Sequence, residues 1–273
     1  MERSTMQAAL FQRVVLVTGG TRGIGRMIAE GLIERGAQVE IVARREDEIA
    51  EASAALGPNC TGVVADLATS EGLDAVVAGL HARHRSIDGI VHNAATSRFS
   101  PLDEPDATFE RWDKVFRLNV TVPFLLTARL LPLLEASTVG ARVIAIGSID
   151  GIRPPMHDAH AYAGSKAALH HVVQMLAPKL GRRGVRINVL APSAITSRMS
   201  QDLLSGREED LARLNPLGRL GERHDIVGAI AFLLSPDSDF VNGAVIPLDG
   251  AVRLQLATSP PEGRTSPNKE LPA

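Results

Sequence analysis

The chain has 273 residues, of which 45% are hydrophobic and 3% aromatic, and it carries a formal net charge of −2 at pH 7. This length and apolar content suit one large α/β domain or two small ones, and the near-neutral charge argues against nucleic acid as a partner. The single cysteine, Cys60, excludes an internal disulfide, and no Cys/His group has the spacing of metal ligands, so we predict no metal site.

Short runs rich in valine and isoleucine alternate with longer segments of helical character. We expect strands at Val14–Thr18, Gln38–Ala43, Cys60–Ala65, Gly89–His92, Arg142–Ile146, Arg186–Ala191 and Ala244–Pro247. We expect helices at Gly23–Arg35, Glu46–Leu56, Ser70–His84, Phe109–Glu135, Tyr162–Leu180 and Asp225–Leu234. Near-continuous apolar strands separated by helices indicate a parallel sheet with helices on both faces. The predicted fold is a doubly wound α/β sheet of about seven strands, with its ligand at the carboxyl ends of the strands.

Two segments depart from this alternation. Residues 196–217 carry polar and charged side chains before Asn215-Pro216, which is typical of a lid over a substrate pocket. The prolines and polar residues of 257–273 predict a disordered tail. No linker divides the rest, so we expect a single domain over residues 1–256.

Prolines interrupt two of the expected helices. Pro123 and Pro132 fall within Phe109–Glu135, so this helix is expected to be kinked or broken. No run of about eighteen consecutive apolar residues is present, and the N-terminus lacks the pattern of a signal peptide. We therefore expect a soluble cytoplasmic protein without a membrane partner.

A glycine-rich segment, Thr18-Gly19-Gly20-Thr21-Arg22-Gly23-Ile24-Gly25, joins the first expected strand to the first expected helix. Glycines allow a backbone to approach a pyrophosphate closely, and the helix N-terminus offers free N–H groups and a positive dipole. An ordinary glycine-rich turn is the alternative. The order strand, glycines, helix favours nucleotide binding in a Rossmann fold. The predicted contacts in this segment are Gly19, Thr21, Arg22, Gly23, Ile24 and Gly25.

The end of the second expected strand bears on the choice of nucleotide. A carboxylate at this tip would bind a ribose 2′-hydroxyl, whereas an arginine favours a 2′-phosphate. The strand ends in Ala43, and Arg44 follows, with Arg22 as a second candidate. We therefore predict NADP(H). The alternative is that Arg44 and Arg45 merely open a solvated helix, paired with the acidic residues 46–48.

The chain contains one tyrosine and four lysines, and Tyr162 precedes Lys166 by four residues. On a helix these side chains lie one turn apart on the same face. A nearby positive charge lowers the pKa of a phenol, which makes it useful for proton transfer near neutral pH. The alternative is a structural tyrosine beside an exposed lysine.

The spacing Gly19-x-x-x-Gly23-x-Gly25 resembles that of the short-chain dehydrogenase/reductase family. The resemblance continues in the correct order over about residues 12–250, through Asp66-Leu67, His92-Asn93-Ala94-Ala95, Asn119, Ser148, Tyr162 with Lys166, and Pro192. His92 and Ala95 differ from the family's Asn-Asn-Ala-Gly. Ser193 and Ala251 stand where the family has glycine, which affects loops near the nicotinamide and a subunit contact.

The resemblance implies a role for each of these residues. Tyr162 would protonate the developing alkoxide, Ser148 would hydrogen-bond the same oxygen, and Lys166 would lower the phenol pKa and hold the nicotinamide ribose. Asn119 would keep a helix open for a proton-carrying water. The further cofactor contacts implied are Asp66, Leu67, Asn93, Ala94, Pro192, Ile195 and Thr196. The family also implies a homotetramer or homodimer.

The expected substrate pocket combines apolar residues with arginines in the segments 96–99, 149–156 and 194–199. These segments are most like those of bacterial β-ketoacyl reductases, including the rhamnolipid-pathway kind, which implies reduction of a 3-oxoacyl thioester on a carrier or on CoA. Of two basic positions that dock a carrier protein in such reductases, one is Arg183 but the other is Val139. Two alternatives stay open: another ketone or secondary alcohol as substrate, and a non-catalytic nucleotide-binding regulator.

Overall fold

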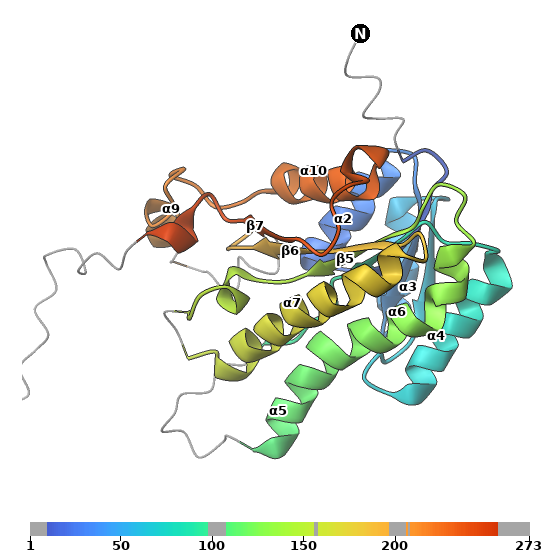
Figure 1. The fold of residues 1–273 in the computed structure, drawn as a ribbon, viewed down its shortest axis with the longest axis horizontal. Helices are drawn as coiled ribbons and strands as arrows, with labels where there is room; N and C mark the ends of the chain where they lie inside the picture. The colour runs from blue at the N-terminus through green and yellow to red at the C-terminus, as the bar shows by residue number, and fades with distance from the viewer. Residues whose placement is uncertain (1–9, 98–107, 156–157, 197–205, 207, 256–273) are drawn as a thin grey trace, which may run out of the picture.

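The computed structural model describes residues 10–97, 108–155, 158–196, 206 and 208–255. The expected tail, residues 197–205 and 207 of the expected lid, and the expected pocket residues Arg98, Phe99 and Met156 lie outside these ranges. Figure 1 shows a central sheet with helices on both sides.

Seven parallel strands form one sheet in the order β3-β2-β1-β4-β5-β6-β7. The strands are β1 Val14–Thr18, β2 Gln38–Ala43, β3 Cys60–Val64, β4 Gly89–His92, β5 Arg142–Ile146, β6 Arg186–Pro192 and β7 Val245–Leu248. The direction of winding reverses between β1 and β4, and in such sheets ligands bind at this switch point, beyond the carboxyl ends. The predicted doubly wound fold is confirmed.

Two layers of helices cover the sheet (Figure 1). The helices are α2 Gly23–Ile33, α3 Glu46–Leu56, α4 Ser70–Arg83, α5 Phe109–Phe116, α6 Val122–Glu135, α7 His160–Gly181, α9 Glu208–Arg213 and α10 Arg223–Leu234. One apolar core joins α4, α6 and α7 to the sheet, and a second joins α2, α3 and α10 to the opposite face. Alternation along β1 shows why both form: Leu16 points into the first core, and Val15 and Val17 into the second.

The expected helix Phe109–Glu135 runs without a break at either proline, but it changes helix type part-way along. A π-helical segment, Arg117–Thr121, separates α5 from α6, and Pro123 lies in the first turn of α6. Pro132 lies inside α6 without ending it. In the described part of the chain, Phe109–Glu135 is the one helical stretch long and apolar enough to cross a membrane. Its Leu126, Leu130 and Leu134 are buried in the first core, which accounts for this apolarity.

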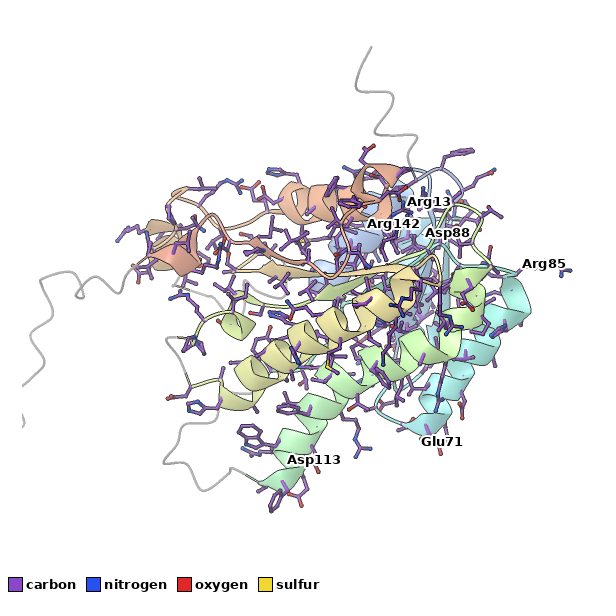
Figure 2. All side chains as sticks on the ribbon, viewed as in Figure 1. Arg13, Glu71, Arg85, Asp88, Asp113 and Arg142 are labelled. Carbon is purple, nitrogen blue, oxygen red and sulfur yellow. The ribbon has the colours of Figure 1, made fainter. Side chains whose placement is uncertain are left out.

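A charged cluster closes the amino-terminal edge of the sheet, opposite the carboxyl ends (Figure 2). Arg142 begins β5 and is only 2% exposed, and it donates to the carbonyl of Gly140 over 2.6 Å and pairs with Asp239. Asp88 accepts a hydrogen bond of 2.9 Å from the backbone of Val14. These bonds satisfy buried polar groups at strand starts, so this edge stabilises the sheet and leaves the opposite edge for a ligand.

Candidate active site

The glycine-rich segment forms a tight cradle between β1 and α2. Gly19 and Gly23 have φ values of +67° and +55°, a region that glycine adopts without strain. A Cβ on Gly25 would lie 2.2 Å from the carbonyl oxygen of Gly19, so only glycine fits there. Arg22 begins α2 with an extended backbone, and no side chain caps the helix. The N–H groups of the first turn are therefore directed at the cradle, which fits a pyrophosphate.

Asn93, predicted as a cofactor contact, lies behind this cradle. Its Nδ2 donates to the carbonyl oxygens of Thr18 (3.0 Å) and Gly19 (3.2 Å). The Thr18 hydroxyl in turn accepts from the backbone N–H groups of Asn93 and Ala94, each over 3.0 Å. The side chain of Asn93 thus shapes the glycine loop by joining the ends of β1 and β4.

The two arginines after β2 differ in their pairing. Arg45 binds Asp47, with Nε to Oδ1 at 3.0 Å, and lies 3.7 Å from a carboxylate oxygen of Glu48. Arg44 and Arg22 are exposed, and neither forms an ion pair with any of the residues that the structure describes. The alternative, in which an arginine merely opens a solvated helix and pairs with its acidic residues, therefore applies to Arg45. Arg44 and Arg22 keep their charge available at the edge of the glycine loop.

The other predicted cofactor residues follow the carboxyl ends of β3 and β6. Asp66 is exposed, and its carboxylate accepts a hydrogen bond from the N–H of Ala68 (3.0 Å), while Leu67 is buried. Pro192 is the last residue of β6, and Ile195 forms an isolated bridge to Gly221. Thr196 donates its N–H to the carbonyl of Gly221 over 2.8 Å. All of these residues lie at the edge of the sheet where the glycine loop lies.

Tyr162 and Ser148 meet beyond the end of β5. Ser148 is 7% exposed, and its hydroxyl accepts a hydrogen bond of 3.1 Å from the N–H of Asp150, in the turn Ile149–Gly151. Tyr162 stands in the first turn of α7 and hydrogen-bonds to Ser148. Burial raises the pKa of Tyr162 to about 12, although the bond to Ser148 acts in the opposite direction. The phenol is therefore protonated at neutral pH.

Lys166 lies one turn beyond Tyr162 on α7, on the same face of the helix, as the spacing predicted. Its Nζ donates a hydrogen bond of 2.7 Å to the carbonyl of Ile146 and lies 5.5 Å from the centroid of the Tyr162 ring. Burial lowers the pKa of Lys166 to about 8. Burial dominates the pKa of Tyr162 in this structure, and the lowering of that pKa by Lys166 stays a prediction.

Asn119 lies in the π-helical segment and is 1% exposed. Its amide oxygen accepts from the N–H of Thr96 and its Nδ2 donates to the carbonyl of Thr96, both over 2.9 Å. Nδ2 also donates to the hydroxyl of Ser165 over 3.0 Å, and that hydroxyl donates to the carbonyl of Tyr162 over 2.7 Å. The π-helical irregularity thus turns an amide toward the helix that carries Tyr162, as such bulges often do at functional sites.

Several residues that contribute to this site were not singled out from the sequence. Ser165 links Asn119 to α7, and the only signal was its position within the Tyr162–Lys166 turn. Asp150 is close enough to Tyr162 to raise the pKa of its phenol. His170 is buried one turn beyond Lys166 on α7. These contacts join segments distant in sequence, so no local pattern marks them.

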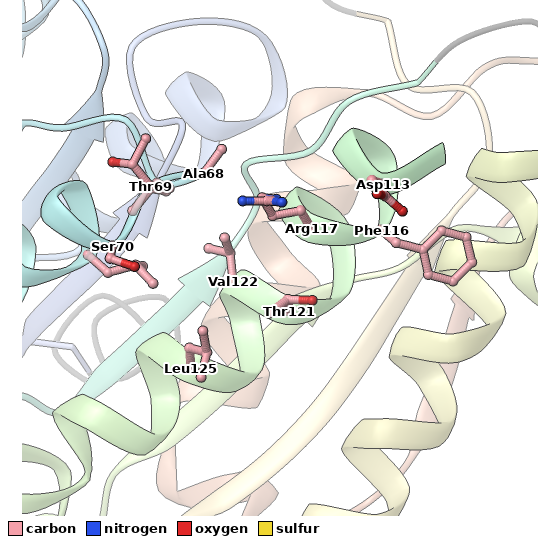
Figure 3. A pocket seen from close by; sticks show the side chains of 11 residues that line it. Ala68, Thr69, Ser70, Asp113, Phe116, Arg117, Thr121, Val122 and Leu125 are labelled. Carbon is pink, nitrogen blue, oxygen red and sulfur yellow. The ribbon is translucent and has the colours of Figure 1, made fainter. Parts of the chain in front are cut away.

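A separate cavity of about 410 Å³ lies between α4 and the α5–α6 helices. Figure 3 shows the Arg117 side chain reaching toward the loop that carries Ala68 and Thr69. None of the four predicted catalytic residues lines this cavity, although Leu67, a predicted cofactor contact, does. Of the predicted substrate pocket, Ile149 is buried behind Ser148, and Ile152 is 42% exposed.

The fold and this site define a class of protein: a doubly wound nucleotide-binding domain with a Ser–Tyr–Lys group beyond its carboxyl edge. Comparisons with known proteins agree with that class. Residues 19–252 match the family described as Enoyl-(Acyl carrier protein) reductase. A rhamnolipids biosynthesis 3-oxoacyl-[acyl-carrier-protein] reductase of Pseudomonas aeruginosa is 38% identical over 254 residues, covering 90% of this chain and 98% of the relative.

Two solved structures are similar over nearly the whole chain. The Pseudomonas aeruginosa RhlG/NADP active-site complex has a TM-score of 0.85 and 37% identity, covering 90% of this chain and 98% of its own. L-sorbose reductase from Gluconobacter frateurii, complexed with NADPH and L-sorbose, has a TM-score of 0.84 and 27% identity, covering 92% and 100%. The chain belongs to the short-chain dehydrogenase/reductase family of oxidoreductases.

Proposed function

We propose that this protein is an NADPH-dependent reductase that transfers hydride to the carbonyl of a 3-oxoacyl thioester. The observation that carries the proposal is the pairing of a neutral Tyr162 with Ser148 beside the buried Lys166. A phenol that stays protonated at neutral pH can donate a proton to a developing alkoxide, as carbonyl reduction requires.

The cofactor fits the residues that are present. The glycine cradle, closed to any side chain at Gly25, would hold the pyrophosphate, and Arg22 and Arg44 would bind a 2′-phosphate. The neighbouring positions proposed to contact the adenine and nicotinamide ends are Asp66, Leu67, Ala94, Tyr162, Lys166, Pro192, Ile195 and Thr196. Asn93 would act indirectly by fixing the loop. When bound, the nicotinamide supplies the hydride.

The residues of the chain supply the remaining chemistry. As negative charge develops on the carbonyl oxygen, Tyr162 and Ser148 can both donate hydrogen bonds to it, and Tyr162 then gives up its proton. Lys166 stabilises the resulting phenolate, since its ammonium is buried next to the ring. Asn119 and Ser165 hold the first turn of α7 in position for this transfer and mark the proposed route for proton resupply.

The substrate class rests on the similarity to the rhamnolipid reductase and on the surface near Arg183. Arg183 is paired with Glu135, with Nη2 to Oε2 at 2.9 Å, and Val139 is 46% exposed. Lys179 and Arg182 are exposed beside Arg183, and neither forms an ion pair with any residue that the structure describes, so this face keeps positive charge that can attract an acidic group. We therefore propose a 3-oxoacyl thioester on CoA or on an acyl carrier protein.

Self-association and a cytoplasmic location are part of the proposal. The α5–α6 helices expose Phe109 (86%) and Phe124 (43%), and α7 exposes Met175 (60%). Such exposed apolar side chains on neighbouring helices favour a homodimer or homotetramer built through them. Light scattering on the purified protein tests this, and a monomer at micromolar concentration would contradict it.

The activity is tested by NADPH oxidation with acetoacetyl-CoA, with longer 3-oxoacyl-CoA thioesters and with the same acyl groups on carrier protein. We expect turnover with these thioesters, and the ratio of kcat/KM between the CoA-bound and carrier-bound forms tells which of the two the enzyme prefers. The similarity to L-sorbose reductase favours a second candidate, reduction of a polyol ketone. Turnover with L-sorbose and none with any thioester would replace the first candidate by the second.

A further inference from the structure

His170 lies on the same face of α7 as Tyr162 and Lys166, at intervals of one helical turn. It is 6% exposed, and its Nε2 is buried without a hydrogen-bond partner in the described structure. No step of the proposed reaction uses this imidazole. Its surroundings nevertheless connect it to the reacting groups.

The ring packs against the two glycines that flank Ser148. A Cβ on Gly147 would lie 2.3 Å from His170 Nε2, and a Cβ on Gly151 would lie 2.7 Å from His170 Cε1. Neither glycine has a positive φ, so backbone conformation does not require glycine at these positions. Glycine is required at both positions because the His170 ring approaches closely. Val189 also lies close to Gly147, and the α7 backbone lies close to Gly151.

Three contacts therefore hold residues 146–151 against one face of α7. Tyr162 bonds Ser148, and Lys166 bonds the carbonyl of Ile146. The His170 ring packs against Gly147 and Gly151, which lie before and after Ser148 in the chain, and it hydrogen-bonds to the Gly151 backbone. Because Nε2 has no partner among the described residues, we assign the proton of the neutral ring to Nδ1, as the donor to the Gly151 backbone.

The ring is neutral in this position. Burial and the nearby charge of Lys166 lower the pKa of His170 to about 4. A neutral ring adds no second positive charge beside Lys166, so the site keeps one cation.

We infer that His170 is a positioning residue for the reduction: wedged between Gly147 and Gly151, it sets the distance between Ser148 and Tyr162. This inference rests on the proposed function for its catalytic consequence, but the geometry that it describes exists without cofactor. A shift of about 1 Å in such a group can lower turnover about 100-fold.

The test compares three variants. His170→Leu keeps an apolar side chain of similar size but removes the Nδ1 donor, whereas His170→Asn retains an N–H near that position. His171→Leu changes the exposed neighbour and is the matched control. We expect His170→Leu to lower kcat by roughly 10- to 100-fold with KM and the Kd for NADPH little changed, and His170→Asn to recover most of the loss. Unchanged kcat in His170→Leu, or an equal loss in His170→Asn and His170→Leu, would overturn the inference.

A second measurement needs neither cofactor nor substrate. Because the chain has one tyrosine, the near-ultraviolet absorbance of tyrosinate after a rapid jump to alkaline pH reports Tyr162 alone. Ser148→Ala should raise the Tyr162 pKa by removing a hydrogen bond that lowers it. His170→Leu should shift the titration in the same direction, and His171→Leu should not. If His170→Leu titrates like the wild type, the inference is wrong, whatever substrate the enzyme uses.

Discussion

Lys166 donates its Nζ hydrogen bond to the backbone carbonyl of Ile146, the last residue of β5, over 2.7 Å. This bond fixes the ammonium beneath the Tyr162 ring, 5.5 Å from its centroid. The charge thus lies at the end of the strand that precedes Ser148, where the two proton-donating groups meet. Burial rather than pairing sets the pKa of both Tyr162 and Lys166.

The first prediction concerns the pH dependence of reduction. The pKa of Lys166 is about 8, so its positive charge is present below that pH and lost above it, while Tyr162 stays protonated throughout. We expect kcat/KM for the ketone to fall as pH rises through about 8. For Lys166→Arg, whose side chain stays charged, kcat/KM should not fall over this pH range. Circular dichroism over the same range controls for unfolding, and a wild-type profile that is flat well above pH 8 would contradict the assignment.

A second prediction separates the two arginines after β2. Arg44→Ala should weaken NADPH binding about 10- to 100-fold, because a charged hydrogen bond to a phosphate is worth about 1.5–3 kcal/mol. NADH binding should hardly change. Arg45→Ala is the matched control, since Asp47 already neutralises Arg45. Titration calorimetry gives both affinities, and an equal loss for NADPH and NADH in Arg44→Ala would refute a 2′-phosphate contact.

The third prediction concerns a strained residue near the end of the described chain. Ala251 has φ +69° and ψ 12°, in the left-handed region where a Cβ costs about 1 kcal/mol. Ala251→Gly should therefore raise the free energy of unfolding by about 0.5–1 kcal/mol. The same change at the exposed Ala55 of α3 should lower it by about 1 kcal/mol. Urea denaturation measures both, and the same sign for both variants would disprove the strain.

Much of the fold could be predicted because the central strands are buried on both faces. Apolar runs such as Val14–Thr18 and Arg142–Ile146 match the observed strands, and the helix ends differ by a few residues. The glycine loop and the Tyr162–Lys166 spacing could also be predicted, because each is a local sequence pattern with one geometry. The short helix α9 was not expected, since four of its six residues are charged and it has no apolar stripe.

The parts of the site that could not be predicted depend on contacts across the fold. The position of the π-helical segment follows from Asn119 bonding to Thr96, which no local propensity encodes. Asn93 lies behind the glycine loop because its Nδ2 hydrogen-bonds to the carbonyls of Thr18 and Gly19. The direction of the Lys166 ammonium likewise depends on a strand 20 residues away in sequence.

A fourth prediction tests the buried carboxylate of Glu40 in β2. Glu40 is 1% exposed and accepts hydrogen bonds from Arg83 (2.7 and 3.0 Å), His84 (2.7 Å) and Thr61 (3.2 Å). Burial would raise the pKa of Glu40, but Arg83 and His84 outweigh it and lower that pKa. Its contribution to stability is therefore present above the unfolded pKa of about 4.5 and lost as pH falls through the folded pKa.

Glu40→Gln should lower the free energy of unfolding at neutral pH by roughly 1–3 kcal/mol. The difference from the wild type should shrink as the pH falls below about 4.5, where the carboxyl of the unfolded chain takes up a proton, and it should level off below the lowered pKa of the folded state. Denaturation at a series of pH values checks this, and a difference that stays constant or grows on acidification would be the contrary result.

The central claim is that Tyr162 donates the proton in an NADPH-dependent carbonyl reduction. Tyr162→Phe removes one hydroxyl and leaves the ring that packs beside Lys166. The decisive measurement is the rate of NADPH oxidation with a 3-oxoacyl-CoA, compared between this variant and the wild type, together with the Kd for NADPH. We predict a loss of turnover of about 100- to 10,000-fold with the Kd nearly unchanged. Turnover within a few-fold of the wild type, with NADPH still bound, would contradict the account.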